Sequence, residues 1–357
     1  MNLPRSLTSY RFLGRSGARV SPIALGTMTF GRKYNWGVDI DDARLIFDTY
    51  VDRGGNFIDT ANTYSDGASE VFIGKFANGK RPRLVIASKY SMTTAADDPN
   101  AGGNHRKNMM RSVEESLKRL NTDYIDLYYL HGWDDHTSVE EIMRGMDDLV
   151  RSGKVTYVAL SNTPAWQVAR MQTISDLRGW APLIAFELQY SLVERAAERD
   201  MIPMARELGL GVIPWSPLGS GLLTGKYSRA DLNFDATKDA SSRKAVALTI
   251  GVLTERSLNI ADAVREIAKE VGKTPAQVAL AWTLLNPAVT APIIGARTIE
   301  QLEDNLGALG VELSDAQEAR LDEVSAIELG YPHDLLASSL QTMLLGQHPA
   351  PVRCDQR

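Results

Sequence analysis

The stretch Tyr124-Ile125-Asp126-Leu127-Tyr128-Tyr129-Leu130-His131 is almost continuously apolar and aromatic. This composition is typical of a strand in a parallel sheet that is buried on both faces. Seven other short runs share this character, and each is followed by a segment whose apolar residues recur at helical spacing. In chain order, the eight runs span residues 22–26, 56–59, 84–89, 124–131, 155–160, 183–188, 211–215 and 291–295.

Helical patterns fill the intervals between these runs. Ser138 and Glu141 form the signature of a capping box, and Pro164 and Pro275 stand in the first turns of their segments, where proline is favoured. The predicted helices span residues 41–53, 108–120, 138–152, 163 onward, 197–208, 258–271, 274–285 and 298–309. Strands that alternate with helices in this way predict an α/β fold, a closed (β/α)8 TIM barrel, with an open doubly wound sheet as the alternative.

Three segments lie outside this alternation. Residues 10–20 predict a β-hairpin ahead of the first barrel strand, where it would cap the barrel floor. Residues 216–253, after the seventh strand, predict a long polar, glycine-rich loop of the kind that is usually functional or disordered. We expect one domain over residues 1–357, with a core at about 8–325 and a C-terminal tail, 326–357, that folds over the barrel mouth or frays.

The composition narrows the classes of function. The 357 residues carry a formal net charge of -5 and no compact Lys/Arg run, which argues against nucleic acid as the main partner. Cys354 is the single cysteine, so an internal disulfide and a cysteine-based metal cluster are excluded, and the scattered histidines do not suggest a metal site. The chain lacks an apolar signal core and an apolar run of membrane-spanning length, so we expect a cytoplasmic protein.

Ionisable residues follow successive predicted strands. Asp59 ends the second strand, Tyr64 lies in the loop after it, Lys89 ends the third strand and His131 the fourth. Each of these residues taken alone has an ordinary structural explanation. Catalytic groups of a barrel gather at the C-terminal strand ends, however, so their joint placement favours a proton-transfer site.

These four residue types suit proton transfer to a carbonyl oxygen. Tyr64 would donate the proton, and we expect the Lys89 ammonium to lower the pKa of Tyr64 by stabilising its phenolate. Asp59 would hold Lys89 in place and keep it protonated, and His131 would donate a hydrogen bond to the carbonyl oxygen.

A glycine-rich stretch at residues 217–227 looks at first like a P-loop because it contains Gly225-Lys226. Ser220 stands where that motif requires its first glycine, and Tyr227 stands where it requires Ser or Thr. What remains is a loop whose backbone N–H groups can approach a pyrophosphate, or else an ordinary surface loop.

Taken together, the residues resemble the aldo-keto reductase superfamily. Asn56 to Tyr64 is similar to the family signature that contains the catalytic Asp and Tyr, with Ser69, Glu70 and Gly74 also fitting it. Residues 86–89 resemble the strand that bears the catalytic Lys, and residues 112–131 resemble the second signature, which ends in the catalytic His. The resemblance covers about residues 8–325, and the long loop after the seventh strand is similar to that of bacterial and channel-β-subunit-like members.

The resemblance implies reduction of an aldehyde or ketone by hydride transfer from a nicotinamide cofactor. Tyr64 would then be the general acid, with Asp59, Lys89 and His131 as its partners. Arg297 is the single obvious candidate for contact with a 2′-phosphate, so NADP(H) is favoured over NAD(H). The cofactor-binding positions implied by the resemblance are Ser161, Asn162, Gln189, Trp215, Ser216, Leu218, Gly219, Gly221, Gly295, Arg297, Gln301 and Asn305.

The substrate is specified only as a class. Trp36, Tyr90 and Trp133 would give the pocket an apolar aromatic lining, which predicts aromatic or bulky carbonyl substrates. A redox-sensing, NADP-binding regulatory protein that resembles channel β subunits is the alternative function, and a scaffold barrel with a relic site is a third. The sequence is compatible with a homo-oligomer but contains no coiled-coil pattern.

Overall fold

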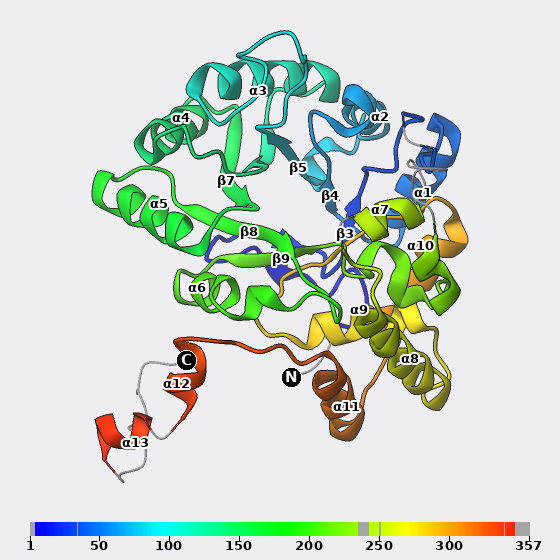
Figure 1. Cartoon of the computed structure of the whole chain (residues 1–357). Coiled ribbons are helices and arrows are strands. Elements are labelled where there is room, and N and C mark those ends of the chain that lie inside the picture. The colour runs from blue at the N-terminus through cyan, green and yellow to red at the C-terminus, as the bar shows by residue number, and fades with distance from the viewer. Residues whose placement is uncertain (1–3, 34, 235–242, 250, 339, 347–357) are drawn as a thin grey trace. The chain divides into compact units, whose positions relative to one another are not determined.

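Eight parallel strands form a single sheet in the computed structural model, which describes residues 4–33, 35–234, 243–249, 251–338 and 340–346 (Figure 1). The order of the strands is β10-β3-β4-β5-β6-β7-β8-β9, and each neighbouring pair is parallel. The strands are β3 (Ala24–Gly26), β4 (Phe57–Asp59), β5 (Val85–Tyr90), β6 (Ile125–Leu130), β7 (Val155–Ser161), β8 (Leu183–Gln189), β9 (Gly211–Trp215) and β10 (Ile293–Ile294).

The sheet closes between its first and last strands. Val212 of β9 forms a parallel bridge with Val289, just ahead of β10. The Thr290 N–H donates to the Val212 carbonyl oxygen at 2.8 Å. The predicted (β/α)8 barrel is therefore confirmed, and an open doubly wound sheet is excluded because its two ends would not meet.

Helices surround the barrel at the predicted places, with ends shifted by a few residues. They are α1 (Ile40–Asp52), α2 (Ala68–Phe76), α3 (Arg106–Leu120), α4 (Val139–Arg151), α5 (Ala165–Arg178), α6 (Met201–Glu207), α8 (Glu255–Glu270), α9 (Pro275–Leu285), α10 (Ile299–Leu306) and α11 (Asp315–Ser325).

The sequence pattern did not predict two of these helices, α2 and α11. Gly74 weakens the helical signal within α2, but a Cβ atom at this position would lie 2.6 Å from the Leu120 carbonyl oxygen of α3. Gly74 therefore permits close packing of α2 on α3.

The predicted capping box at Ser138 forms only in half. The Ser138 hydroxyl accepts from the Glu141 N–H at 3.2 Å, as expected. The Glu141 carboxylate instead accepts from the backbone N–H of Arg106, the first residue of α3, at 2.9 Å. Glu141 therefore ties two neighbouring helices together because the first-turn N–H groups of α3 also need an acceptor.

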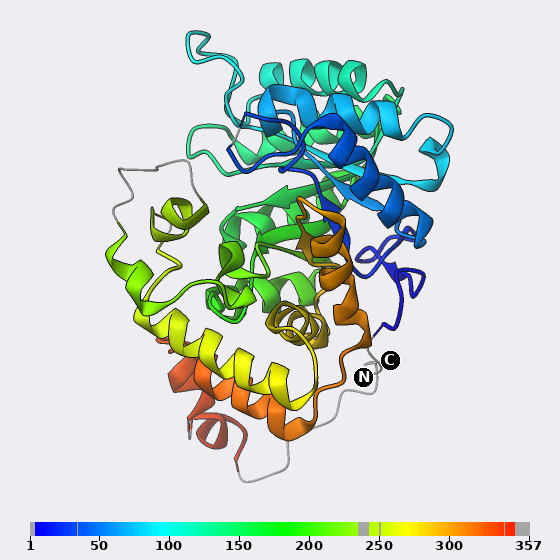
Figure 2. The same ribbon diagram turned by 90° about the vertical axis from the view of Figure 1, so that its right-hand side faces the viewer.

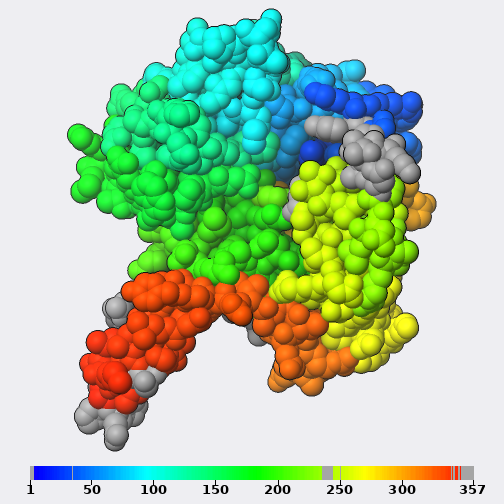
Figure 3. Space-filling view, in the orientation of Figure 1, coloured from blue at the N-terminus to red at the C-terminus, as the bar shows by residue number. Residues whose placement is uncertain are grey.

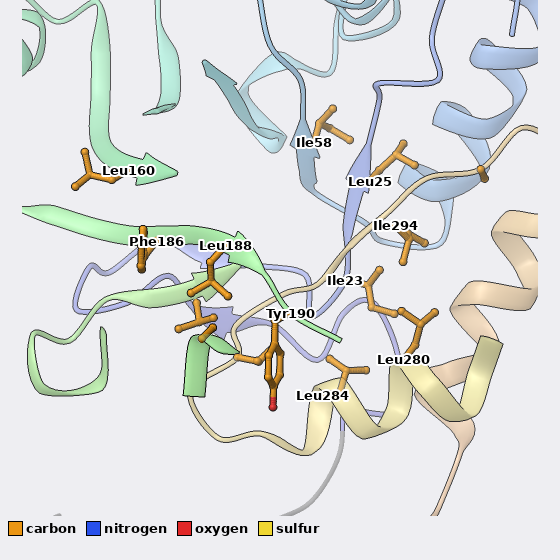
Figure 4. Close-up of a cluster of buried hydrophobic side chains, with 14 of the residues drawn as sticks. Ile23, Leu25, Ile58, Leu160, Phe186, Leu188, Tyr190, Leu280, Leu284 and Ile294 are labelled. Atoms are coloured by element: carbon orange, nitrogen blue, oxygen red, sulfur yellow. The ribbon is translucent and has the colours of Figure 1, made fainter. Parts of the chain in front are cut away.

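The strands bury side chains on both faces. Their inner side chains, together with Leu13 and Val20 of the N-terminal hairpin and Ala291 ahead of β10, form the barrel core, to which the strands contribute Ala24, Phe57, Ala87, Leu127, Tyr129, Ala159, Ile184, Ala185 and Ile213. Their outer side chains pack against the helices (Figure 4), where Ile23, Ile294 and Tyr190 lie beside Leu280 and Leu284 of α9. This two-sided burial accounts for the nearly continuous apolar runs in the sequence.

The N-terminal hairpin closes the barrel floor, as predicted. It consists of β1 (Arg11–Phe12) and β2 (Arg19–Val20), and the side chain of Leu13 at its turn is fully buried in the barrel core. The Arg15 N–H donates to the Gly209 carbonyl oxygen at 2.8 Å. Figure 2 shows the hairpin in dark blue at the opposite end of the barrel from α7 (Arg243–Thr249), which lies in the segment after β9.

The segment after β9 is more regular than the sequence suggested. It contains the short helical turns Gly219–Thr224 and Arg229–Asn233 as well as α7, while residues 235–242 and 250 lie outside the described part. Figure 3 shows the region near residue 100, drawn in cyan, at the top of the view, and α7 and α8, drawn in yellow-green and yellow, at its right-hand side.

Contacts divide the chain into two compact units, Met1–Ser325 and Ala326–Arg357. The second unit contains α12 (His333–Ala337) and α13 (Leu340–Leu345). That this tail either folds over the barrel mouth or frays stays a prediction. Across the described residues, none of the helices has both the length and the apolar character that a bilayer crossing requires.

Gly14→Ala tests the role of the hairpin. Gly14 has a φ of +54°, and a Cβ atom there would lie 2.1 Å from the Ile184 carbonyl oxygen. We expect the free energy of unfolding, measured by urea denaturation, to fall by about 2 kcal/mol or more. Gly17→Ala is the matched control because a Cβ at Gly17 meets nothing within 4 Å. Equal stability of the two variants would contradict a packed floor.

Candidate active site

A buried ion pair lies inside the barrel at the C-terminal ends of β4 and β5. Asp59 is the last residue of β4, and Lys89 lies one residue before the end of β5. The Lys89 ammonium lies 2.6 and 2.7 Å from the two carboxylate oxygens of Asp59 and also donates to the Thr60 carbonyl oxygen at 3.0 Å. Both side chains are almost completely buried, so the pair is stabilised by short contacts and not by water.

Tyr64 and His131 complete a cluster around this pair. Tyr64 begins a tight turn after β4, in which Ser65 and Asp66 have φ values of 48° and 55°. The turn directs the Tyr64 hydroxyl to 3.4 Å from the Lys89 ammonium. The Tyr64 ring meets the His131 ring edge-on, with centroids 5.9 Å apart. The structure thus brings together the four residues that the sequence singled out as a proton-transfer site.

Glu187 is a further member of the cluster that the sequence interpretation missed. It lies in β8 with its carboxyl group buried, and its Oε2 atom is 3.5 Å from the Lys89 ammonium. Glu187 is two residues after Ala185, whose side chain belongs to the barrel core, so Glu187 points to the same inner face of the strand. The sequence pattern could have indicated Glu187, because it is a glutamate within an apolar strand and a buried carboxyl group requires a partner.

The burial of the cluster changes the acidity of its members. Burial acts to lower the pKa of Lys89, but the Asp59 and Glu187 carboxyl groups raise it more strongly, so Lys89 stays charged. Burial, together with the positive charge of Lys89, lowers the pKa of His131 to about 3. The imidazole is therefore neutral at pH 7 and retains one N–H donor.

The pKa of Tyr64 differs from the expectation that Lys89 would lower it. Burial raises the pKa of Tyr64 above its ordinary value, Lys89 opposes this rise, and the charges of Asp59 and Glu187 add to it. Lys89 acts in the expected direction, but burial of the phenol outweighs its effect, so the net pKa of Tyr64 is raised. Tyr64 is consequently held in its protonated form, ready to donate.

Polar residues after β7 and β9 are hydrogen-bonded beside this cluster. The Asn162 amide donates to the His131 carbonyl oxygen at 2.9 Å and to the Ser161 hydroxyl at 3.0 Å. The Trp215 indole N–H donates to the Asn162 amide oxygen at 3.0 Å. Gln189 is half-buried and pairs in register with Trp215. Ser161, Asn162, Gln189 and Trp215, which were predicted to bind the cofactor, therefore lie at neighbouring strand ends.

The loop after β9 has a backbone suited to an anion. Positive φ values occur at Ser216, Gly219, Ser220 and Gly221, and Leu218 lies among them. The Ser216 hydroxyl accepts from the Ser220 N–H at 3.0 Å. A Cβ atom at Gly221 would lie 2.6 Å from the Lys226 ammonium, so a cation rests against this backbone. Successive left-handed residues with a nearby ammonium fit a pyrophosphate group.

A second group of predicted cofactor residues gathers after β10, at the start of α10. The Arg297 N–H donates to the Gln301 side-chain oxygen at 2.9 Å. The Asn305 amide donates to the Gly295 carbonyl oxygen at 3.5 Å. The Arg297 side chain is exposed, so its guanidinium is accessible to an anion.

The three predicted substrate residues have different environments. Trp36 is 7% exposed, and Trp133 is half-buried with its indole N–H donating to Asp135 at 2.9 Å. Tyr90 does not fit its predicted place: it is fully buried and stacks on Tyr128 with ring centroids 5.5 Å apart. Lys89 points inward, so the next residue along the strand points outward into the helix layer.

The comparisons with known proteins agree with this geometry. The model of the Aldo/keto reductase family matches residues 22–326, and the chain belongs to this family. Uncharacterized oxidoreductase YrpG of Bacillus subtilis (strain 168) is 41% identical over 318 residues, which cover 85% of this chain and 92% of YrpG. Norsolorinic acid reductase stcV of Emericella nidulans is 35% identical over 371 residues, covering 99% and 92% of the two chains. Aryl-alcohol dehydrogenase [NADP(+)] of Phanerodontia chrysosporium is 34% identical over 358 residues, covering 92% and 89%.

Lys89→Met tests the charge balance of the cluster. The variant leaves two buried carboxyl groups without their cation, and we expect the free energy of unfolding to fall by about 3–5 kcal/mol at pH 8. The loss should be smaller at pH 5.5, because the native state then binds protons at these carboxyl groups that the unfolded state does not. Urea denaturation at both pH values measures the difference. An equal loss at both values, or a loss no larger than that of exposed Lys107→Met, would contradict the account.

Proposed function

We propose that this chain is an NADP(H)-dependent oxidoreductase that reduces aldehydes or ketones to alcohols, with Tyr64 as the general acid. The observation that carries the proposal is the position of the Tyr64 hydroxyl, 3.4 Å from a buried ammonium that Asp59 holds at 2.6 Å. A phenol beside a fixed positive charge can give up its proton because the resulting phenolate is stabilised there.

Each member of the cluster has a distinct part in the proposed reaction. The nicotinamide cofactor, when bound, supplies the hydride. Tyr64 gives its proton to the carbonyl oxygen, and Lys89 stabilises the phenolate that remains. Asp59 fixes the Lys89 ammonium through two short contacts. His131, neutral because its pKa is lowered to about 3, donates a hydrogen bond from its N–H to the same oxygen.

The residues present fit a dinucleotide. The loop from Ser216 to Gly221 contains several left-handed residues, and Lys226, which lies against Gly221, offers positive charge to a pyrophosphate. Exposed Arg297 supports a preference for the 2′-phosphate of NADP(H). The relative from Phanerodontia chrysosporium carries NADP(+) and an aryl alcohol in its name, which supports both the cofactor and an aromatic carbonyl as substrate. Of the three residues predicted to line the pocket, Trp133 is half-buried, whereas Trp36 and Tyr90 are buried.

Cofactor oxidation measured by absorbance tests the proposed function. We expect turnover of aromatic aldehydes with NADPH, a lower kcat/KM with NADH, and a lower kcat/KM with small charged carbonyls. Tyr64→Phe should lower kcat by about 100-fold or more, which is the usual contribution of a positioned general acid.

Cofactor affinity is the control, because Tyr64→Phe should bind NADPH as the unmodified protein does. A variant that retains most of its turnover would remove Tyr64 from the acid role. Tight NADPH binding without turnover on any carbonyl would instead favour a redox-sensing regulatory protein.

A further inference from the structure

Glu187 places a second carboxyl group on a lysine that already has an ionic partner. The Lys89 ammonium has three protons, and it contacts Asp59, the Thr60 carbonyl oxygen and the Tyr64 hydroxyl at 2.6 to 3.4 Å. Glu187 Oε2, at 3.5 Å, is the most distant of these oxygens, and it is buried without a hydrogen-bond partner. One ammonium therefore faces two carboxyl groups and satisfies only the nearer one.

The groups around Glu187 include no cation besides Lys89 that could balance a negative charge on Glu187 in addition to that on Asp59, among the described residues. The charged and titratable groups that face it are Asp59 on β4, Tyr64 after β4, Lys89 on β5 and Tyr129 on β6. Within the described residues, Lys89 is the single cation that forms an ion pair with Glu187. Two like charges in a dry site with one counter-charge are unfavourable, so one carboxyl group takes up a proton.

We propose that Glu187 is a positioning residue of the reduction site. Its carboxyl group is a neutral acid in the native protein, and when it ionises it weakens Tyr64 as a proton donor. The proposal rests on the function proposed above. While Glu187 is protonated, the Lys89 charge is balanced by Asp59 alone and can stabilise a Tyr64 phenolate. When Glu187 ionises, its negative charge opposes the negative charge that forms on Tyr64.

The arrangement has a consequence for pH dependence. Burial, followed by the negative charge of Asp59, raises the pKa of Glu187 to about 8, although Lys89 acts against both. The pKa of Tyr64 itself is raised above its ordinary value, so ionisation of Tyr64 does not limit the reaction in this range. We therefore expect ionisation of Glu187 to cause an alkaline loss of carbonyl reduction.

Glu187→Gln replaces the carboxyl group by a neutral amide of the same shape, so the variant mimics protonated Glu187 and cannot ionise. For the unmodified protein, we expect kcat/KM for aldehyde reduction to fall about tenfold between pH 7 and pH 9. For Glu187→Gln, the fall should be less than about twofold. Glu70→Gln is the matched control, because Glu70 is an equally buried glutamate that pairs with Arg119 away from the site. This control should keep the alkaline fall of the unmodified protein.

A measurement that needs neither substrate nor cofactor tests the protonation of Glu187 directly. In the native state Glu187 keeps its proton to about pH 8, whereas a glutamate in the unfolded chain loses it near pH 4.3. Between these values the native state binds one more proton, so rising pH favours unfolding. The free energy of unfolding should therefore fall between pH 5 and pH 8 more steeply than that of Glu187→Gln, by the slope of one proton. Should the amide fail to fold, Glu187→Met serves in its place.

The two measurements separate the proposals. Parallel unfolding slopes for the unmodified protein and the neutral variant would overturn the proposal, because Glu187 would then be ionised in the native state. A one-proton difference in slope with an unchanged alkaline fall in kcat/KM would also overturn it, because Glu187 would not act on Tyr64. Absence of carbonyl reduction in the unmodified protein, with the slope difference present, would reject the function proposed for the site while confirming the neutral acid.

Discussion

The contact between Lys89 and Asp59 is the constraint on which the rest of the site depends. A lysine that is completely buried stays charged only if a carboxylate lies against it, and Asp59 does so at 2.6 and 2.7 Å. The pair then fixes the position of Tyr64 and sets the charge that Glu187 encounters. Neutral His131 follows from the same source, because Lys89 adds to the effect of burial on its pKa.

The barrel supplies this contact through the period of its strands. Inner side chains near the floor are apolar and close the barrel around Leu13 of the hairpin. Two residues further along, the inward positions of β4, β5 and β8 are Asp59, Lys89 and Glu187. The packed floor thus forces the polar layer to the mouth, where loops rather than strands complete the site. The same loops offer a left-handed backbone beside Ser216 for a phosphate.

Much of this architecture follows from sequence pattern because strands buried on both faces leave a clear apolar signal. The strand ends, and with them Asp59, Lys89 and His131, were predictable for that reason. Side-chain direction was harder: Tyr90 was placed in the pocket, although alternation with Lys89 sends it outward onto Tyr128. The direction of the Tyr64 pKa was missed because it depends first on burial, and Glu187 was missed because its role depends on its distance from Lys89. Such a balance is a property of distances, which a single sequence does not contain.

The central claim is that burial, against the opposing charge of Lys89, keeps Tyr64 a protonated donor in the free protein. Ultraviolet difference titration of the cofactor-free protein against Tyr64→Phe measures the phenolate of this one tyrosine. The account predicts that no Tyr64 phenolate appears below about pH 10, the ordinary pKa of a tyrosine. A phenolate that titrates near pH 7 to 8 would contradict it, because the charge of Lys89 would then outweigh the effect of burial on the pKa of Tyr64.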